Sequence, residues 1–241
     1  MESGAKYCKR QPDEERASQK TYQGLIGSVN YAAVAVRADI LYTVGLLGRF
    51  ASDPSASHYE GAKRLLRYLK KTEGFELGLG KQDNGIGSAI YADADFAGNL
   101  DGWRSTSGMV VKDRYGATVA WKSTKQPLTT RSTGDAEYIA TAMAMEFMWI
   151  ANLEAELHHE VSRGLISVFN DNEACIANLE CNEHQPNNRH VGVRYSWIRD
   201  MVRLGKAMIN HIPSDEMPAD SLTKGLDREK HNLFLCYLGL K

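Results

Sequence analysis

Two carboxylates end the apolar run Ala89–Asp95, whose sequence is Ala-Ile-Tyr-Ala-Asp-Ala-Asp. Gly87 and Gly98 bound this run, so it is predicted to form a buried strand on which Asp93 and Asp95 point to the same face. Two like charges on a core strand are costly unless a cation compensates them, because a buried unpaired carboxylate takes up a proton instead. The run therefore predicts a cleft that holds a cation. The alternative is a solvated Asp pair that opens a loop.

Three further acids fall at the ends of other predicted elements. Glu137 lies in the first turn of a predicted helix, Asp171 follows a predicted strand at 165–169, and Asp220 begins a short terminal helix. Sites in open α/β sheets form outside strand ends, and clustered carboxylates there suit hard cations such as Mg²⁺. Two such ions, roughly 4 Å apart, activate a water molecule and stabilise the leaving oxygen in phosphodiester cleavage.

The composition is that of a globular protein. With 241 residues, 43% of them hydrophobic, the chain is long enough for one sizeable core or two modest domains. Its net charge of -1 means that any polyanionic partner must be met by local basic patches or by metal ions. The four cysteines form no C-x-x-C pair, which predicts free thiols in a reducing compartment and argues against structural zinc. Because we find no secretory leader and no run of ~18 apolar residues, we expect a soluble, intracellular protein without a membrane partner.

The first third of the chain has helical patterns. Residues 1–20 are polar and are predicted to form a mobile tail. From residue 22 onward, apolar residues recur at spacings of three and four, which predicts two packed helices that end at Asp53-Pro54. Ser57 and Glu60 form a predicted capping box for a third helix.

The third predicted helix carries a basic cluster inside a nearly neutral chain. Such a run is usually a solvated helix face, because exposure is the default for Lys and Arg. The alternative is contact with phosphate groups. The cluster comprises Lys63, Arg64, Arg67, Lys70 and Lys71.

The rest of the chain predicts a mixed sheet covered by helices. Glycines cluster between residues 74 and 87, so we expect a domain boundary at 75–87. Beyond it, β-branched apolar runs predict strands and apolar stripes at helical spacing predict helices, which together indicate an α/β architecture. The predicted strands are 89–95, 107–112, 117–122, 165–169 and 207–212. The predicted helices are a long one from 136 to 157, a short one after residue 172, one capped by Asn187 or Asn188, a short one within 213–224 and a last one at 228–238.

Seven motifs between about residues 87 and 225 resemble, in their sequence and their order, the ribonuclease H domain of copia-type retrotransposon polyproteins. Three more resemble the segment just upstream, the thumb and connection helices at the end of the reverse transcriptase. No Tyr-x-Asp-Asp occurs, so DNA synthesis cannot be assigned to this chain alone. The ribonuclease H motifs are Tyr91-Ala-Asp-Ala-Asp-Phe-Ala-Gly98, Arg104-Ser-Thr-Ser-Gly108, Trp121-Lys-Ser-Thr-Lys-Gln126, Asp135-Ala-Glu-Tyr138, Asp171-Asn172, His190-Val-Gly-Val-Arg-Tyr195 and Ala219-Asp-Ser-Leu-Thr-Lys224. The upstream ones are Tyr22-Gln-Gly-Leu-Ile-Gly27, Arg37-Ala-Asp-Ile40 and Arg64-Leu-Leu-Arg-Tyr-Leu69.

The resemblance implies a ribonuclease H-like α/β fold, with a mixed five-stranded sheet flanked by helices and preceded by a small helical subdomain. The implied organisation is a flexible tail at 1–20, a thumb- and connection-like helical segment at 21–75, a ribonuclease H-like domain at 87–225 and a C-terminal helix at 226–241. The implied partners are an RNA/DNA hybrid and the reverse transcriptase palm and fingers, or the integrase, of the same polyprotein. The implied location is the cytoplasm, with virus-like particles or the nucleus as alternatives.

By the same resemblance, the metal-binding and catalytic residues are Asp93, Glu137, Asp171 and Asp220. The family reaction is endonucleolytic hydrolysis of the RNA strand of an RNA/DNA hybrid with two Mg²⁺ ions, or Mn²⁺ in their place, and it leaves a 3′-hydroxyl and a 5′-phosphate. We hypothesise that Asp93 bridges both ions and that Asp220 holds the ion that activates water. Glu137 and Asp171 would hold the ion near the leaving oxygen. Asp95 fits a supporting role better than a metal-ligand role.

Further residues are candidates for contact with the substrate. His211 is a candidate for proton transfer, because ribonucleases H of other kinds place a His on a nearby loop; the alternative is a partly exposed edge-strand residue. Basic and hydroxyl side chains near the expected cleft are candidates for contact with phosphates and 2′-hydroxyls, whereas Trp121 is expected to be a core residue. These candidate contacts are Arg104, Ser105, Thr106, Lys122, Lys125, Arg189, His190, Arg194, Lys63 and Arg67.

Two other functions fit parts of the sequence. An Asp-x-Asp pair after an apolar strand also begins aspartyl phosphatases, but Ala97 stands where that chemistry usually has Thr or Val. A catalytically inactive module for nucleic-acid binding or polyprotein assembly would keep the basic helix and the α/β domain. Four positions depart from the family pattern without removing a carboxylate, namely Phe96, Gly134, Gly192 and Pro218.

Overall fold

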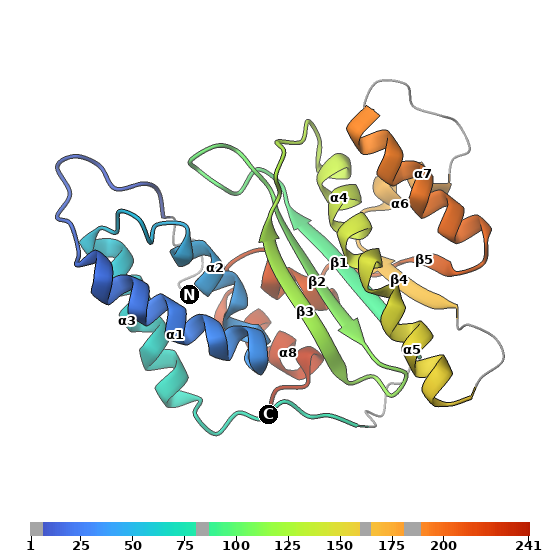
Figure 1. Ribbon diagram of the computed structural model, residues 1–241, viewed down its shortest axis with the longest axis horizontal. Coiled ribbons are helices and arrows are strands. Elements are labelled where there is room, and N and C mark those ends of the chain that lie inside the picture. Colours follow the sequence, from blue (N-terminus) through green and yellow to red (C-terminus); the bar gives the residue numbers. More distant parts are fainter. Residues whose placement is uncertain (1–6, 81–86, 160–164, 181–188) are drawn as a thin grey trace.

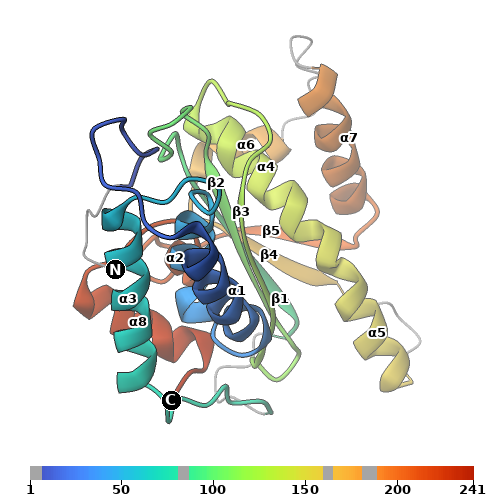
Figure 2. The same ribbon diagram turned by 60° about the vertical axis from the view of Figure 1, so that its left-hand side comes forward.

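A central sheet separates two groups of helices in the computed structural model (Figure 1). The structure describes residues 7–80, 87–159, 165–180 and 189–241, with the side chains of 180 and 189–195 outside that description. On one face of the sheet lie the N-terminal helices and α8 (Arg228–Leu238), and on the other lie the helices from α4 (Thr133–Met145) to α7 (Arg189–Arg203) (Figures 1 and 2). This mixed sheet with flanking helices confirms the predicted fold class.

The sheet has five strands in the order β3-β2-β1-β4-β5. Strands β1, β2 and β3 form an antiparallel meander, whereas β4 pairs parallel to β1 and β5 pairs parallel to β4. Because β1 and β4 run in the same direction, their carboxyl ends meet at one edge of the sheet. The strands are β1 Ala89–Asp95, β2 Thr106–Lys112, β3 Thr118–Lys125, β4 Ile166–Asn170 and β5 Ala207–His211.

Two of the N-terminal helices begin with side-chain caps. Ser18 caps α1, and Ser55 caps α3 through a capping box in which the His58 ring accepts the Ser55 N–H at 3.0 Å. The prediction of Ser57 and Glu60 as this box was therefore wrong by two residues, because the chain turns into the helix earlier. These elements are α1 Gln19–Ala35, η1 Ala38–Ile40, α2 Leu41–Gly48 and α3 Ala56–Lys71.

The described part of the predicted mobile tail is tied to the turn before α3. Arg10 and Arg16 both form ion pairs with Asp53, with N–O distances of 3.1 and 3.0 Å. The Ala17 N–H donates to the Pro54 carbonyl at 2.9 Å. The described residues of this stretch are therefore held against the turn at Asp53 and Pro54, which corrects the expectation of a mobile tail for that part.

The helices of the second half differ from the prediction in one place. The long helix predicted for residues 136–157 is interrupted by a 3₁₀ turn, η2, so that α4 and α5 are separate helices. The predicted caps Asn187 and Asn188 lie outside the described residues. The elements are α4 Thr133–Met145, η2 Glu146–Met148, α5 Trp149–Leu157, α6 Glu173–Glu180, α7 Arg189–Arg203, η3 Pro218–Leu222 and α8 Arg228–Leu238.

The core on the helical-segment face is continuous across the predicted boundary at 75–87. Tyr91 and Val110 from the sheet belong to one buried cluster with Tyr22 of α1, Leu47 of α2 and Leu222 of η3. The indole N–H of Trp121 also donates to the Ala33 carbonyl at 2.9 Å, in agreement with a core role for this Trp. The helical segment therefore covers one face of the sheet. A second cluster fills the opposite face, between the sheet and α4 to α7.

Candidate metal centre

Three of the four predicted carboxylates meet at the edge where β1 and β4 end. Oxygen atoms of Asp93, Glu137 and Asp171 all lie within 4.8 Å of one another. Asp93 comes from β1, Asp171 directly follows β4, and Glu137 lies in α4, which packs close to β1 because its facing residues Ala136 and Ala140 are small. The parallel pairing and this close helix-to-sheet packing together assemble the cluster.

Buried hydrogen bonds orient Glu137. Its Oε1 atom accepts the Ala94 N–H at 3.2 Å, and its Oε2 atom accepts from Asn170 Nδ2 at 3.1 Å. Asn170 is itself fully buried and also donates to the Ala92 carbonyl at 3.2 Å, so it connects β1, β4 and α4. Sequence reasoning missed Asn170, although its place just before Asp171 was a signal for a supporting role.

The carboxylates repel one another where water is scarce. Burial, followed by the nearby charge of Asp220, raises the pKa of Asp93 to about 7. Burial, followed by the charge of Asp93, raises the pKa of Glu137 to about 9. Groups held in this way favour a compensating cation, since a cation stabilises the charged forms that burial and repulsion disfavour.

Asp220 approaches the cluster from the other side of the sheet edge. It lies on η3, which Pro218 begins in the first turn, where a missing N–H costs little. The side chain is buried and pairs with Lys224, whose Nζ atom lies 2.8 Å from Asp220 Oδ1. Thr223, the residue before Lys224, donates its hydroxyl hydrogen to Asp93 Oδ2. Asp220 thus lies beside the triad, close enough for its charge to act on Asp93.

Gly108 allows η3 to lie directly on the sheet. It pairs with Asp93 in the register of β1 and β2. A Cβ atom added at this position would lie 2.7 Å from Thr223 Cγ2 and 2.8 Å from the Ala219 carbonyl oxygen, closer than real contacts allow. The absence of a side chain at Gly108 therefore lets Asp220 approach Asp93.

We expect Gly108→Ala to displace η3 and to cost about 1–3 kcal/mol of stability, as is usual when a close-packed site is overfilled. Thermal unfolding measures this effect. Gly134→Ala is the matched control, because the nearest atom to an added Cβ there, Ser132 Oγ, is 3.9 Å away. Equal behaviour of the two variants would show that the packing of η3 does not matter.

The donor set fits divalent cations. Hard ions such as Mg²⁺ take oxygen ligands, and carboxylates from Asp93, Glu137 and Asp171 converge closely enough to share one ion. The raised pKa values of Asp93 and Glu137 have the same cause, which is uncompensated negative charge. The cluster is therefore able to bind a divalent metal ion.

Comparison with known proteins places the chain in a family. The Pol polyprotein of transposon TNT 1-94 from Nicotiana tabacum is 35% identical over 213 residues, which are 88% of this chain and 16% of that protein. The Pol polyprotein of transposon RE1 from Arabidopsis thaliana is 32% identical over 220 residues, which are 91% of this chain and 15% of that protein. The chain belongs to the copia-type retrotransposon Pol family. It spans about a sixth of the length of these relatives, and the predicted resemblance is confirmed.

Other comparisons give smaller or weaker matches. The secreted RxLR effector protein 161 of Plasmopara viticola is 38% identical over 131 residues, which are 54% of this chain and 90% of that protein. The solved structure of LC11-RNase H1 in complex with an RNA/DNA hybrid covers 56% of this chain and 93% of its own, with a TM-score of 0.41 and 21% identity. A search against family models found no match.

Two further candidate residues of this copia-type chain lie outside the carboxylate triad. Asp95 is partly exposed and lies outside the triad, where the charges of Lys224 and Arg49 partly offset the burial that raises its pKa. His211 is the exposed last residue of β5 and pairs in register with Asn170. Asp95 thus fits the predicted supporting role, while proton transfer by His211 stays a prediction.

The predicted contacts on β2 need a correction. Ser105 and Thr106 are buried, and their hydroxyl oxygens accept from the Ala97 N–H and from Arg49 Nη2, both at 3.1 Å. They were predicted to touch nucleic acid, but the fold uses both hydroxyls internally. Arg49, which the sequence did not single out, is instead the residue that brings a charge from the helical segment to this strand end.

Cations surround the same strand end. Arg104 and Lys125 are exposed there, and burial together with repulsion from Arg49 and Arg104 lowers the pKa of Lys125. Lys122, three residues earlier on β3, lies on the opposite face of the sheet, because side chains alternate along a strand. The predicted nucleic-acid contacts of this copia-type domain therefore do not share one surface: Arg104 and Lys125 lie at the strand end, and Lys122 lies on the opposite face of the sheet. The side chains of Arg189, His190 and Arg194, on α7, lie outside the described residues.

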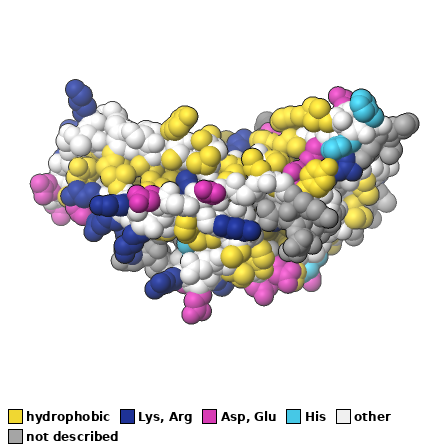
Figure 3. Space-filling model, turned by 90° about the horizontal axis from the view of Figure 1, so that it is seen from below, with side chains coloured by type: hydrophobic (Ala, Val, Ile, Leu, Met, Phe, Trp, Pro, Cys, Tyr) yellow, Lys and Arg dark blue, Asp and Glu magenta, His cyan; other side chains and the backbone are white. Residues whose placement is uncertain are grey.

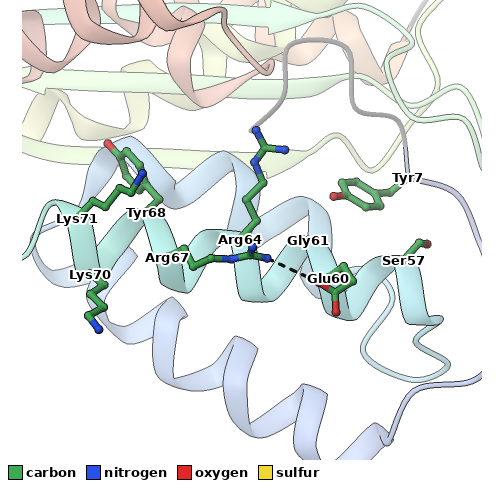
Figure 4. A pocket seen from close by; sticks show the side chains of 9 residues that line it. All are labelled: Tyr7, Ser57, Glu60, Gly61, Arg64, Arg67, Tyr68, Lys70 and Lys71. Carbon is green, nitrogen blue, oxygen red and sulfur yellow. Dashed lines mark ion pairs between the residues drawn. The ribbon is translucent and has the colours of Figure 1, made fainter.

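A basic pocket lies along α3. The cavity measures about 920 Å³, and Figure 4 shows Arg64, Tyr68 and Lys71 projecting from one side of the helix, whereas Lys70 projects away. The predicted contact Arg67 lines this pocket and lies 3.6 Å from Glu60, while Lys63 pairs with Glu60 at 2.7 Å without lining it. On the face shown in Figure 3, most of the visible Lys and Arg side chains gather over the left half, where the helical segment lies.

The basic pocket continues toward the metal centre. A second cavity of about 670 Å³ shares Arg64, Tyr68 and Lys71 with the first and extends to Ser221 and Lys224, which flank Asp220. In the described parts of the chain, no helix is long and apolar enough to cross a membrane.

Proposed function

We propose that this chain is a metal-dependent endonuclease that hydrolyses the RNA strand of RNA/DNA hybrids during retrotransposon reverse transcription. The observation that carries the proposal is the convergence of Asp93, Glu137 and Asp171, from three elements far apart in the sequence, within 4.8 Å. The ordered motifs of the ribonuclease H domain supply the reaction class, and membership in the copia-type Pol family supplies the biological setting.

Divalent ions, Mg²⁺ or Mn²⁺, would be held by Asp93, Glu137 and Asp171, with Asp220 as a further ligand for a second ion. When bound, such ions supply an activated water molecule and charge stabilisation of the leaving oxygen. The chain itself fixes the ligands: Asn170 and the Ala94 N–H orient Glu137, and Thr223 orients Asp93.

The substrate would approach from the side of the helical segment. The cavities along α3 lead from Lys71 and Arg67 to Lys224 beside Asp220, so one nucleic-acid backbone could follow basic residues to the metal centre. At the strand end, Arg104 and Lys125 offer a second set of phosphate contacts. The remaining parts of the polyprotein, its polymerase palm and fingers or its integrase, are the proposed protein partners.

A cleavage assay tests the proposal directly. The wild-type chain, with Mg²⁺ or Mn²⁺, should cut labelled RNA in a hybrid with DNA, leave a 5′-phosphate and stop when the metal is chelated. Glu137→Gln should lose this activity, whereas Asp135→Asn, on the same helix and outside the triad, should keep it. Hybrid binding without cutting would support an inactive binding module instead, and release of inorganic phosphate would support a phosphatase.

The basic pocket leads to a separate prediction on affinity. Removing the charge of Arg67 or Lys71 should weaken hybrid binding for all sequences. Each removal should reduce the slope of the logarithm of the binding constant against the logarithm of the salt concentration by about 1, because one counterion fewer is released. Lys63→Ala should have little effect, because Lys63 does not line the pocket. Fluorescence anisotropy across a salt series measures both. Loss of affinity in the Lys63 variant alone would place the binding surface on another face of α3.

A further inference from the structure

The four carboxylates of the metal centre differ in their contacts with cationic side chains. Asp93, Glu137 and Asp171 converge within 4.8 Å, and no Lys or Arg among the described residues forms an ion pair with any of the three. Asp220, in contrast, already has the ammonium group of Lys224 at 2.8 Å. The chain itself thus places one cation beside Asp220, and the charge of this cation also acts on Asp93.

The contact between Lys224 and Asp220 is of the kind that a cation makes. The Asp220 Oδ1 atom is buried, and the Lys224 ammonium group lies 2.8 Å from it, so a cation is the direct neighbour of this buried carboxylate oxygen. The Asp220 side chain is 4% exposed, whereas that of Lys224 is 44% exposed. The ammonium group therefore reaches a buried carboxylate from the solvent side and has space to leave.

The backbone after η3 holds Lys224 in this place. The N–H groups of Thr223 and Lys224 both donate to the Asp220 carbonyl, at 3.2 and 3.3 Å. Thr223 is fully buried and donates its hydroxyl hydrogen to Asp93. Thr223 thus contacts Asp93 and the next residue, Lys224, contacts Asp220. The same turn positions both Thr223 and Lys224.

We propose that the Lys224 ammonium group occupies the second cation position in the substrate-free protein, so that the free chain binds one divalent ion and not two. This inference rests on the proposed function and refines its metal count. A divalent ion beside Asp220 would be repelled by an ammonium group a few Å away, and the repulsion is strong where water is scarce. Lys224 would therefore have to swing out, toward a phosphate oxygen of the substrate, before a second ion enters. Lys224 is thus a positioning residue that couples substrate binding to the second ion.

Counting bound Mn²⁺ without substrate tests this proposal. Titration followed by the electron paramagnetic resonance signal of free Mn²⁺, with calorimetry alongside, should give one ion per chain for the wild type and for Lys224→Arg. Lys224→Met should bind two ions, because Asp220 becomes free to act as a ligand. The double variant Asp220→Asn with Lys224→Met should return to one ion. Lys230→Met, on the exposed face of α8, should also bind one.

The outcomes separate this inference from the proposed function. Two ions in the wild type, or one ion in Lys224→Met, would overturn the role of Lys224 and leave the nuclease proposal standing. No binding in any variant would overturn both. Because removal of Lys224 leaves Asp220 buried without its partner, thermal unfolding of each variant checks the fold. If Lys224→Met does not fold, Lys224→Gln, which removes the charge and keeps a polar side chain, is the second variant that should bind two ions, and one ion in a folded Lys224→Gln would overturn the role of Lys224.

Discussion

Asp93→Asn should abolish metal-dependent cleavage of an RNA/DNA hybrid while the fold is kept. Asp93 belongs to the triad, the charge of Asp220 acts on it, and it accepts the hydroxyl hydrogen of Thr223, three residues after Asp220. An amide is a poor ligand for a hard cation. We expect cleavage to fall by more than about 100-fold, the usual upper cost of losing even an outer partner of a metal ligand.

The same substitution should stabilise the protein when metal is absent. The raised pKa values of Asp93 and Glu137 mean that the folded chain binds more protons than the unfolded chain between the ordinary carboxyl range and about 7 for Asp93 or about 9 for Glu137. The free energy of unfolding therefore falls as pH rises through that window. Without metal, Asp93→Asn should raise the Tm above pH 7 by at least about 3 °C, and the gain should shrink toward pH 4.

Melting curves in chelator across this pH range, together with cleavage rates in Mg²⁺, check both parts of the prediction. Asp200→Asn, on the exposed face of α7, is the control that should change neither quantity. An Asp93→Asn protein that cuts at the wild-type rate would remove Asp93 from the metal centre. A Tm that does not respond to the substitution would mean that the carboxylates do not repel one another in the metal-free fold.

Deleting the helical segment up to residue 75 should leave a chain that does not fold cooperatively. Tyr91, Val110 and Trp121 face this segment from the sheet and would become exposed to water. Burial of one large apolar side chain is worth about 1.5–3 kcal/mol. A whole domain has only about 5–15 kcal/mol to lose. The loss of this shared core should therefore exceed the stability of the remainder.

Near-ultraviolet circular dichroism and binding of a hydrophobic dye distinguish the outcomes. We expect the fragment 76–241 to retain helical signal, lose the near-ultraviolet spectrum and bind the dye, as compact states without fixed packing do. The full chain, purified in the same way, is the reference. A fragment with a cooperative melt and hybrid cleavage like the full chain would show that the ribonuclease H-like part is independent of the helical segment.

The strands could be predicted from the sequence because they depend on local patterns, and so could the places of Asp93 and Asp171 at strand ends. An apolar run that ends in acids predicts a strand end, and parallel neighbours bring such ends together. Asp93 and Asp171 follow this rule. Glu137 was singled out by its place in the first turn of a predicted helix and by the resemblance to ribonuclease H domains.

The parts that escaped prediction depend on contacts between segments far apart in the chain. The reason for a glycine at position 108 could not be read from the sequence, because only the position of η3 shows why a side chain is excluded there. The contacts of Arg49 with Thr106 and of Lys224 with Asp220 were not predicted either. Ser105 was misjudged for the same reason, since the loop that buries its hydroxyl is set by tertiary packing.

Diffraction from crystals soaked in Mn²⁺ tests the central claim most directly, because the anomalous signal locates the ion itself. The account predicts a peak coordinated by oxygen atoms of Asp93, Glu137 and Asp171, and its loss in crystals of Glu137→Gln. A Mn²⁺ ion bound elsewhere on the chain, with this cluster empty at saturating concentration, would contradict it.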